Sequence, residues 1–244
     1  MRLLRYYGWS KKPDVKECAE RAFRDLSRTL VYSETTNGLS NMDSSARREY
    51  EKCKKDFFNK VCGKIDKRVK EHLENLSQNY DDWHRVTCDE IRNFALEFPL
   101  EGTKQKLFGR EINKKYMTFY HGQAQKWLNI TFKNMWIIGL LEEKIQDENQ
   151  LNEFLKELHT PVDDYILEVA TTEDKSIKSR LDEPYIFEKG KNNSWSRWDY
   201  MNDYEPFQKH IKKAMQSRFI TRLEWDNEAW SEIAEIRRNK KILE

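Results

Sequence analysis

Two residues that lie far apart in the sequence could together carry out nucleophilic chemistry on a sugar carbon. Lys126 lies near the start of one predicted amphipathic helix, and Asp163 lies in the first turn of a later one. Apolar neighbours such as Trp127 and the dipole at a helix N-terminus both favour the neutral, nucleophilic form of a lysine amine. Backbone N–H groups at a helix start keep a carboxylate ionised and fixed in direction, so it can stabilise a cationic sugar or orient the amine. If the two ends meet, they form a lyase-type centre.

Two helices must position this pair. The first begins near Gly122, and its core-facing residues recur at helical spacing: Ala124, Trp127, Leu128, Thr131, Met135 and Ile138. The second is predicted to begin with Thr160 as its N-cap, Pro161 at its first position and Asp163 at its third. A purely structural interpretation competes with the catalytic one, because surface lysines are usually solvated and an aspartate at this position is usually part of a helix cap.

The residues of this region resemble a known family of DNA repair enzymes. Lys126, Lys133 and Met135, followed by Pro161-Val-Asp163, are similar to the helix-hairpin-helix DNA glycosylase superfamily, and most of all to its archaeal 8-oxoguanine glycosylase branch. The resemblance implies an all-α fold with the active site in a cleft between two helical halves. It also implies that Lys126, supported by Asp163, attacks the anomeric carbon of a nucleotide in DNA that carries a modified or damaged base. The lysine then forms a Schiff base with the sugar. No cofactor is implied, because the amine supplies the covalent step.

The chain departs from that family at two places. The hairpin of the family has two glycines, which let backbone N–H groups approach a DNA phosphate. The corresponding segment His121-Gly122-Gln-Ala contains one, so Gly122 is the candidate for a backbone contact with phosphate. Residues 142–158 form an insertion.

A loop rich in aromatic residues could form a pocket for a flipped base. Such a pocket must stack and hydrogen-bond the base once it has left the helix. Trp195-Ser-Arg-Trp198-Asp-Tyr200 is an aromatic cluster outside a periodic helix, so Trp195 and Trp198 are candidates, and Gln125 could read a base edge with its amide. Alternatively, the two tryptophans cover the core at a domain junction and the amide is solvated or caps a helix.

Two basic segments could contact phosphates. Residues 47–70 also contain acids that can pair with the lysines within one helix. Residues 209–222 contain no acid, so this segment is the better phosphate-binding candidate. Its residues are Lys209, Lys212, Lys213, Arg218 and Arg222. A plain solvated face is the alternative for both segments.

Other functions remain open. One is a non-catalytic helical module that binds nucleic acid or a protein partner through the C-terminal basic segment. Another is a helical nuclease, since Arg68-Val-Lys-Glu-His72 places an arginine and a histidine on one helix. The sequence has no nucleophile elbow, no glycine-rich phosphate loop and no pair of histidines at metal-ligand spacing. We therefore predict neither a metal nor a cofactor.

Composition predicts a mainly α-helical protein. The 244 residues include only 8 glycines and 5 prolines, and 13% are aromatic, which disfavours both a turn-rich β fold and disorder. We predict one compact unit over residues 1–244, with halves at 1–100 and 101–244. The net charge of +2 is too small for a polybasic nucleic-acid coat. Four widely spaced cysteines and the lack of a long apolar segment predict a cytoplasmic protein in a reducing compartment, without a membrane span.

The remaining elements are predicted from periodicity and capping residues. A helix follows Pro13, and residues 46–77 form one helix or two that break near Gly63. A further helix is predicted to start at a capping box at Thr87–Glu90, and another to follow residues 99–103 and end at about Tyr116. A short helix is predicted over residues 151–158, and most of residues 200–243 are predicted to be helical. A short strand is predicted at 184–188.

Overall fold

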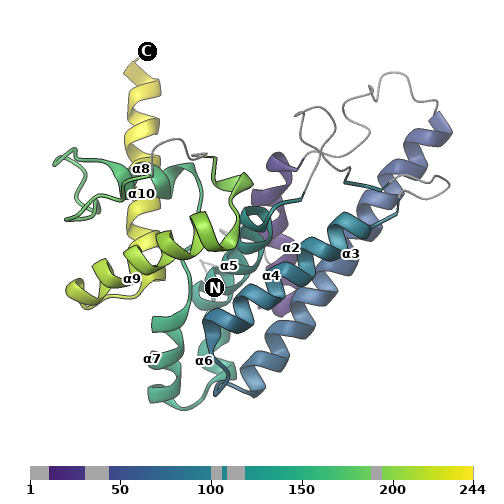
Figure 1. The fold of residues 1–244 in the computed structure, drawn as a ribbon, viewed down its shortest axis with the longest axis horizontal. Helices are drawn as coiled ribbons and strands as arrows, with labels where there is room; N and C mark the ends of the chain where they lie inside the picture. Colours follow the sequence, from purple (N-terminus) through teal and green to yellow (C-terminus); the bar gives the residue numbers. More distant parts are fainter. Residues whose placement is uncertain (1–10, 31–43, 100–105, 109–118, 188–193, 244) are drawn as a thin grey trace.

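The described part of the protein is all-α, which confirms the predicted fold class. The computed structural model describes residues 11–30, 44–99, 106–108, 119–187 and 194–243, and in these ranges it has nine α-helices and no strand (Figure 1). The helices are α2 (Val15–Leu26), α3 (Ser44–Glu74), α4 (Tyr80–Glu97), α5 (His121–Ile137), α6 (Leu140–Lys144), α7 (Glu148–Glu157), α8 (Asp164–Thr171), α9 (Glu205–Arg218) and α10 (Arg222–Leu243). Three short helical turns accompany them: η1 (Ser27–Thr29), η4 (Trp195–Arg197) and the π-helical turn η5 (Tyr200–Tyr204).

The helix α5 lies at the centre of the arrangement. It packs against α2 and α4 and also contacts the turns η4 and η5. Figure 1 shows the long helices α3 and α4 running side by side on one side of α5, with α8, α9 and α10 on the other. Because neighbours surround it, α5 buries polar residues as well as its apolar face.

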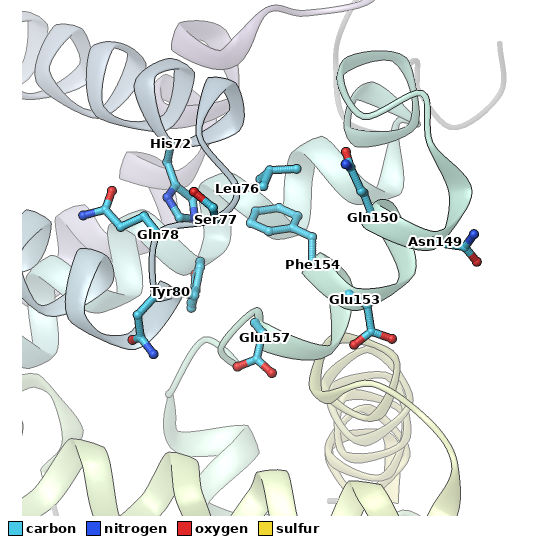
Figure 2. Close-up of a pocket in the computed structure, with 11 residues that line it drawn as sticks. His72, Leu76, Ser77, Gln78, Tyr80, Asn149, Gln150, Glu153, Phe154 and Glu157 are labelled. Carbon is cyan, nitrogen blue, oxygen red and sulfur yellow. The ribbon is translucent and has the colours of Figure 1, made fainter.

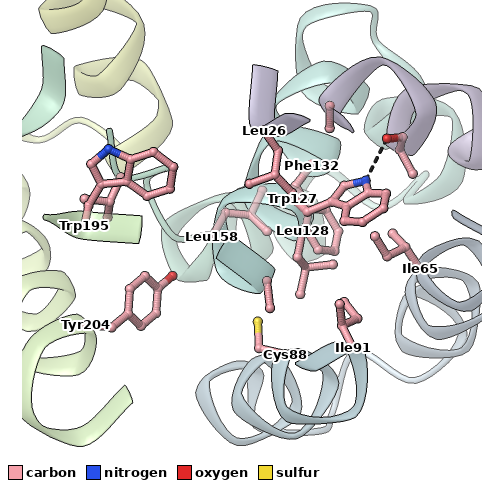
Figure 3. Close-up of a cluster of buried hydrophobic side chains, with 14 of the residues drawn as sticks. Leu26, Ile65, Cys88, Ile91, Trp127, Leu128, Phe132, Leu158, Trp195 and Tyr204 are labelled. Carbon is pink, nitrogen blue, oxygen red and sulfur yellow. Dashed lines mark hydrogen bonds between the residues drawn. The ribbon is translucent and has the colours of Figure 1, made fainter. Parts of the chain in front are cut away.

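The core is built around the aromatic side chains of α5. Trp127 and Phe132 are almost completely buried, and Leu128 lies between them in sequence on the same helix (Figure 3). The indole Nε1 of Trp127 donates a hydrogen bond of 2.8 Å to the carbonyl of Ala19 on α2. A buried donor without such a partner would cost about 1–3 kcal/mol. This bond therefore fixes α5 against α2 while the ring fills the core.

Two helix starts show how capping decides where a helix begins. Asp14 caps α2 in a capping box and accepts a hydrogen bond of 2.8 Å from the backbone N–H of Glu17, directly after Pro13. Asn79 caps α4. The capping box predicted at Thr87–Glu90 is wrong, because these residues lie inside α4, where preceding residues already continue the helix.

Other local predictions have mixed outcomes. The helix α3 runs through Gly63 without a break, so the one-helix alternative is confirmed. The strand predicted at 184–188 is wrong for the described residues 184–187, which are irregular, and the N–H of Tyr185 donates to the carbonyl of Ala170 in α8 at 2.7 Å. The helix predicted to end near Tyr116 falls mostly outside the described residues.

Membrane crossing and disulfide bonding can both be assessed for the described ranges. None of the helices there combines the length and the apolar content needed to cross a bilayer. All four cysteines are buried thiols outside any disulfide.

Candidate catalytic centre at Lys126

The side chains of Lys126 and Asp163 meet in the folded protein. The Nζ atom of Lys126 lies 3.5 Å from Oδ2 of Asp163, although the residues are 37 positions apart in sequence. Lys126 is only 6% exposed, and its amine lies 4.3 Å from the centre of the Trp195 ring. The amine therefore lies between a carboxylate and an aromatic face, two groups that attract a cation.

The start of α8 holds the carboxylate of Asp163 in place. Its Oδ1 atom accepts hydrogen bonds from the backbone N–H groups of Tyr165 at 3.0 Å and Ile166 at 3.1 Å. Asp163 is therefore the N-cap of α8, and the predicted cap at Thr160 is wrong. The hydroxyl of Thr160 instead donates to Asp226 on α10 at 3.1 Å. With Oδ1 committed to the helix, Oδ2 is the oxygen that faces the amine.

Gly122 allows the turn η4 to pack closely on the start of α5. Its N–H donates to the carbonyl of Trp198 at 3.0 Å, and a Cβ atom at this position would lie 1.9 Å from the carbonyl oxygen of Trp195. A glycine is required here because the two backbones touch. In this conformation the amide of Gly122 is occupied within the protein, and the residue is buried, so the predicted phosphate contact is not formed by an open backbone group.

Two of the three predicted base-pocket residues are held by contacts inside the described part of the protein. Gln125 is completely buried; its amide nitrogen donates to the carbonyl of Gly122 at 2.8 Å, and its oxygen accepts from Asn129 at 2.9 Å. Trp198 is also buried, and the centroid of its ring lies 5.3 Å from the centroid of the Phe207 ring. Of the three, Trp195 is the one that lies against the amine of Lys126, so only its ring is placed to stack on a group entering there.

A second lysine of α5 forms a similar pair. Lys133 lies seven residues after Lys126, about two helical turns further along the same face, and it pairs with Asp226 on α10. Burial raises the pKa of the Asp226 carboxyl, and the neighbouring Lys133 opposes that rise. Reasoning from the sequence did not identify Asp226, since nothing in its local pattern distinguishes it from other acids of α10. The pair of Lys133 and Asp226 can therefore be compared with the pair of Lys126 and Asp163 on the same helix.

The predicted C-terminal phosphate surface is largely paired with acids from other segments. Four of its five cations lie near carboxylates of residues outside the segment 209–222. The fifth cation, Arg222, is buried. The partners are Glu205 for Lys209, Glu157 for Lys212, Glu183 for Lys213, Asp182 for Arg218, and the backbone oxygens of Glu157 and Gln208 for Arg222. Surface pairs of this kind contribute about 0–1 kcal/mol each, so a phosphate could replace the exposed ones at small cost, but not the buried contacts of Arg222.

A hollow of 540 Å³ lies away from Lys126, between the end of α3, the start of α4 and α7 (Figure 2). Its lining includes His72, Tyr80, Phe154 and Glu157, and neither Lys126 nor Asp163 belongs to it. The ring of His72 stacks on Trp83 with the centroids 4.2 Å apart. Burial lowers the pKa of His72 to about 4. The histidine of the nuclease hypothesis is therefore an aromatic packing residue at the edge of this hollow, and it is neutral at physiological pH.

One group of side chains has the donor atoms of a metal centre. The ligand atoms of His84, Cys88 and His121 lie within 4.8 Å of one another, and all three residues are buried. His84 and Cys88 are four residues apart on α4, so they share a face. This mixed histidine–cysteine spacing is the sequence signal for the group, and a search for pairs of histidines alone does not find it.

Comparisons with other proteins add no assignment to this geometry. A scan of the sequence against protein-family models, a search of the curated proteins and a search of the solved structures each found no match.

Proposed function

We propose that this protein is a DNA glycosylase-like enzyme with lyase activity, in which Lys126 is the nucleophile and Asp163 its carboxylate partner. The observation that carries the proposal is the contact of 3.5 Å between a buried amine and a carboxylate fixed at a helix start. In this proposal the fold is a helix-hairpin-helix glycosylase-like arrangement of two helical halves around a cleft. The substrate is a modified or damaged base in DNA, and the protein acts in the cytoplasm.

The proposed reaction begins with the transfer of a proton from the Lys126 ammonium to the departing base, with Asp163 beside both groups. The C1′–N bond then breaks, and the base leaves with the bonding electrons. The negative charge of Asp163 stabilises the cationic character that develops at C1′, and the nitrogen lone pair forms the new C1′–N bond. A second proton passes from the nitrogen to the ring oxygen as the sugar opens. The two protons lost by the ammonium thus balance those gained by the base and the ring oxygen, and a Schiff base remains.

Trp195 gives this site a surface for stacking. Aromatic side chains commonly hold a flipped base in enzymes that act on DNA. Because the ring of Trp195 is 4% exposed and lies on the amine, a base that reaches Lys126 must stack against this ring or displace it. Trp195 therefore acts in the proposal as a movable cover as well as a stacking partner.

Borohydride trapping tests the proposal directly. The reductant converts a Schiff base between enzyme and DNA into a stable amine, which is detected as a slowly migrating band on a denaturing gel. The substrates are duplexes with one abasic site or one oxidised guanine. We expect the parent protein to form the adduct and Lys126→Met to lose it. Lys133→Met is the matched control: it removes the other paired lysine of the same helix and should retain trapping if circular dichroism shows that it folds.

Two results would contradict the enzymatic proposal. One is the absence of any adduct with the parent protein on both substrates. The other is equal trapping by Lys126→Met and the parent, since abasic sugars also react with ordinary surface lysines. A third variant, Asp163→Asn, keeps the shape of the cap but removes its charge, and we expect it to slow trapping without abolishing it.

A non-catalytic helical module is the second candidate function. The observation in its favour is the pair formed by Lys133 and Asp226, which has the same composition as the first pair and joins α5 to α10, with side-chain exposures of 16% for the lysine and 2% for the aspartate. A lysine–aspartate pair of this kind can serve helix packing alone. Failure to trap an adduct, together with salt-sensitive binding of undamaged DNA, would favour this function.

A further inference from the structure

Three buried side chains converge where α4 meets the start of α5. His84 and Cys88 come from α4, and His121 is the first residue of α5. His84 and Cys88 are completely buried, and His121 is 4% exposed. Their donor atoms all lie within 4.8 Å of one another. Nothing in the proposed glycosylase chemistry uses these side chains.

The spacing within this cluster fits one shared metal ion. The Sγ atom of Cys88 is 3.8 Å from Nδ1 of His84. In a tetrahedral zinc centre, with bonds of about 2.3 Å to sulfur and about 2.0–2.1 Å to nitrogen, the sulfur and nitrogen ligands are about 3.5 Å apart. A shift of a few tenths of an ångström would bring these two atoms to the separation of zinc ligands, and a larger movement of His121, whose ligand atom lies within 4.8 Å of the other two, would complete the set.

A hydrogen bond orients His84 for this role. Its Nε2 atom lies 2.8 Å from Oδ1 of Asn129. The amide nitrogen of Asn129 has acceptors in Gln125, Thr160 and Tyr204, which assigns its oxygen to the histidine. Nε2 must then carry the proton, which leaves Nδ1 with the lone pair that a metal requires, while the sulfur of Cys88 is 3.8 Å from Nδ1 and 3.9 Å from Nε2. Metal-binding histidines are typically held in this way by a partner on the other ring nitrogen.

His121 gives the second, independent indication. Both of its ring nitrogens are buried, and neither has a hydrogen-bond partner among the described residues. The carboxylate of Asp89 is 3.7 Å from Nδ1, beyond hydrogen-bond reach, although His121 is close enough to lower the pKa of Asp89. Leaving a buried polar group without a partner destabilises the folded state. A ligand between His121, His84 and Cys88 would remove that cost.

We propose that His84, Cys88 and His121 bind one divalent transition-metal ion, and that zinc is the ion preferred. Two imidazoles and a thiolate are the ligands that zinc takes in proteins, whereas magnesium and calcium require oxygen ligands. The negative charges of the Cys88 thiolate and of nearby Asp89 match the charge of the ion. Zinc in proteins is usually four-coordinate, so three protein ligands leave its fourth position to a water molecule or another ligand. The ion would fasten α4 to the N-terminal end of α5, one and a half turns before Lys126.

Cobalt substitution tests the proposal on the full chain. The protein is treated with a chelator, dialysed and titrated with cobalt chloride, and the absorption spectrum is recorded. We expect one ion per chain, a thiolate-to-cobalt charge-transfer band in the near ultraviolet and the visible bands of tetrahedral cobalt. Zinc chloride should displace the cobalt and abolish both signals.

Paired variants identify the ligands. Cys88→Ala should lose the charge-transfer band, and Cys88→Ala and His121→Gln should each weaken zinc binding by more than about 100-fold, because even partners outside the coordination sphere contribute about 10–100-fold. Cys62→Ala and His72→Gln are the matched controls, since both residues are equally buried but lie outside the cluster. These variants should retain the spectrum and the affinity.

Several outcomes would overturn the proposal. The folded parent protein could give no charge-transfer band at saturating cobalt, or Cys88→Ala could keep the band and the affinity. If Cys88→Ala fails to fold, the parent spectrum and His121→Gln decide the question. None of these readouts depends on glycosylase activity, so the metal site can be confirmed or rejected whatever the outcome of borohydride trapping.

Discussion

Replacement of Gly122 by alanine tests how the turn η4 is held against α5. The new Cβ atom would lie 1.9 Å from the carbonyl oxygen of Trp195, and such contacts are essentially never shorter than 3.0 Å. The turn or the helix must therefore move by about 1 Å. That movement also strains the hydrogen bond of 3.0 Å from the Gly122 N–H to the carbonyl of Trp198.

The size of the effect follows from three contributions. Overpacking of this kind costs about 1–3 kcal/mol, and loss of the backbone hydrogen bond costs about 1 kcal/mol more. The higher helix propensity of alanine returns at most about 1 kcal/mol, and less in the first turn of α5 than in a helix interior. We therefore expect Gly122→Ala to lower the free energy of unfolding by about 1–3 kcal/mol.

Urea denaturation followed by circular dichroism measures this difference. Gly63→Ala is the matched control, because Gly63 is also helical but a Cβ atom there has no neighbour within 4 Å among the described residues. The control should be stabilised by about 1 kcal/mol through helix propensity alone. If Gly122→Ala were as stable as Gly63→Ala, or more stable than the parent, the close packing of η4 on α5 would be refuted, and with it the position of Trp195 over Lys126.

Two further perturbations have outcomes set by burial. Lys133→Met leaves the carboxylate of Asp226 buried without its cation, so it should lower the free energy of unfolding by about 3–5 kcal/mol near neutral pH. Because a neutral carboxyl tolerates burial, this loss of stability should become smaller as the pH falls. A loss that urea titrations show to be independent of pH would contradict this reasoning. Burial lowers the pKa values of His72 and His84 in the folded protein below their values in the unfolded chain, and the pKa of His72 falls to about 4. The unfolded chain therefore binds more protons below about pH 6.5, and stability should decrease as the pH falls from there, by about 1.4 kcal/mol per pH unit for each histidine. His72→Gln should give a shallower decrease, and an unchanged slope would show that His72 does not titrate on unfolding.

The sequence determined the helices wherever local chemistry was sufficient. The spacing of apolar residues and a side-chain cap are properties of neighbouring positions, so α2, α5 and α7 begin close to where they were predicted. Prediction failed where one local pattern fits two situations. Thr87–Glu90 has the composition of a capping box, but inside α4 the same residues simply continue a helix that Asn79 had already started.

The tertiary structure alone decided which charges meet. Residues 209–222 contain no acid, yet acids from α7, from the start of α9 and from the segment before Pro184 pair with their cations. In the same way, His121 joins His84 and Cys88 only because α5 packs across α4. The sequence identified Lys126 and Asp163 as chemically suited to each other, but their contact depends on how the start of α8 lies against α5. Local interactions select a helix within a few residues, whereas the burial of a charge and the choice of its partner depend on packing between segments that are distant in the chain.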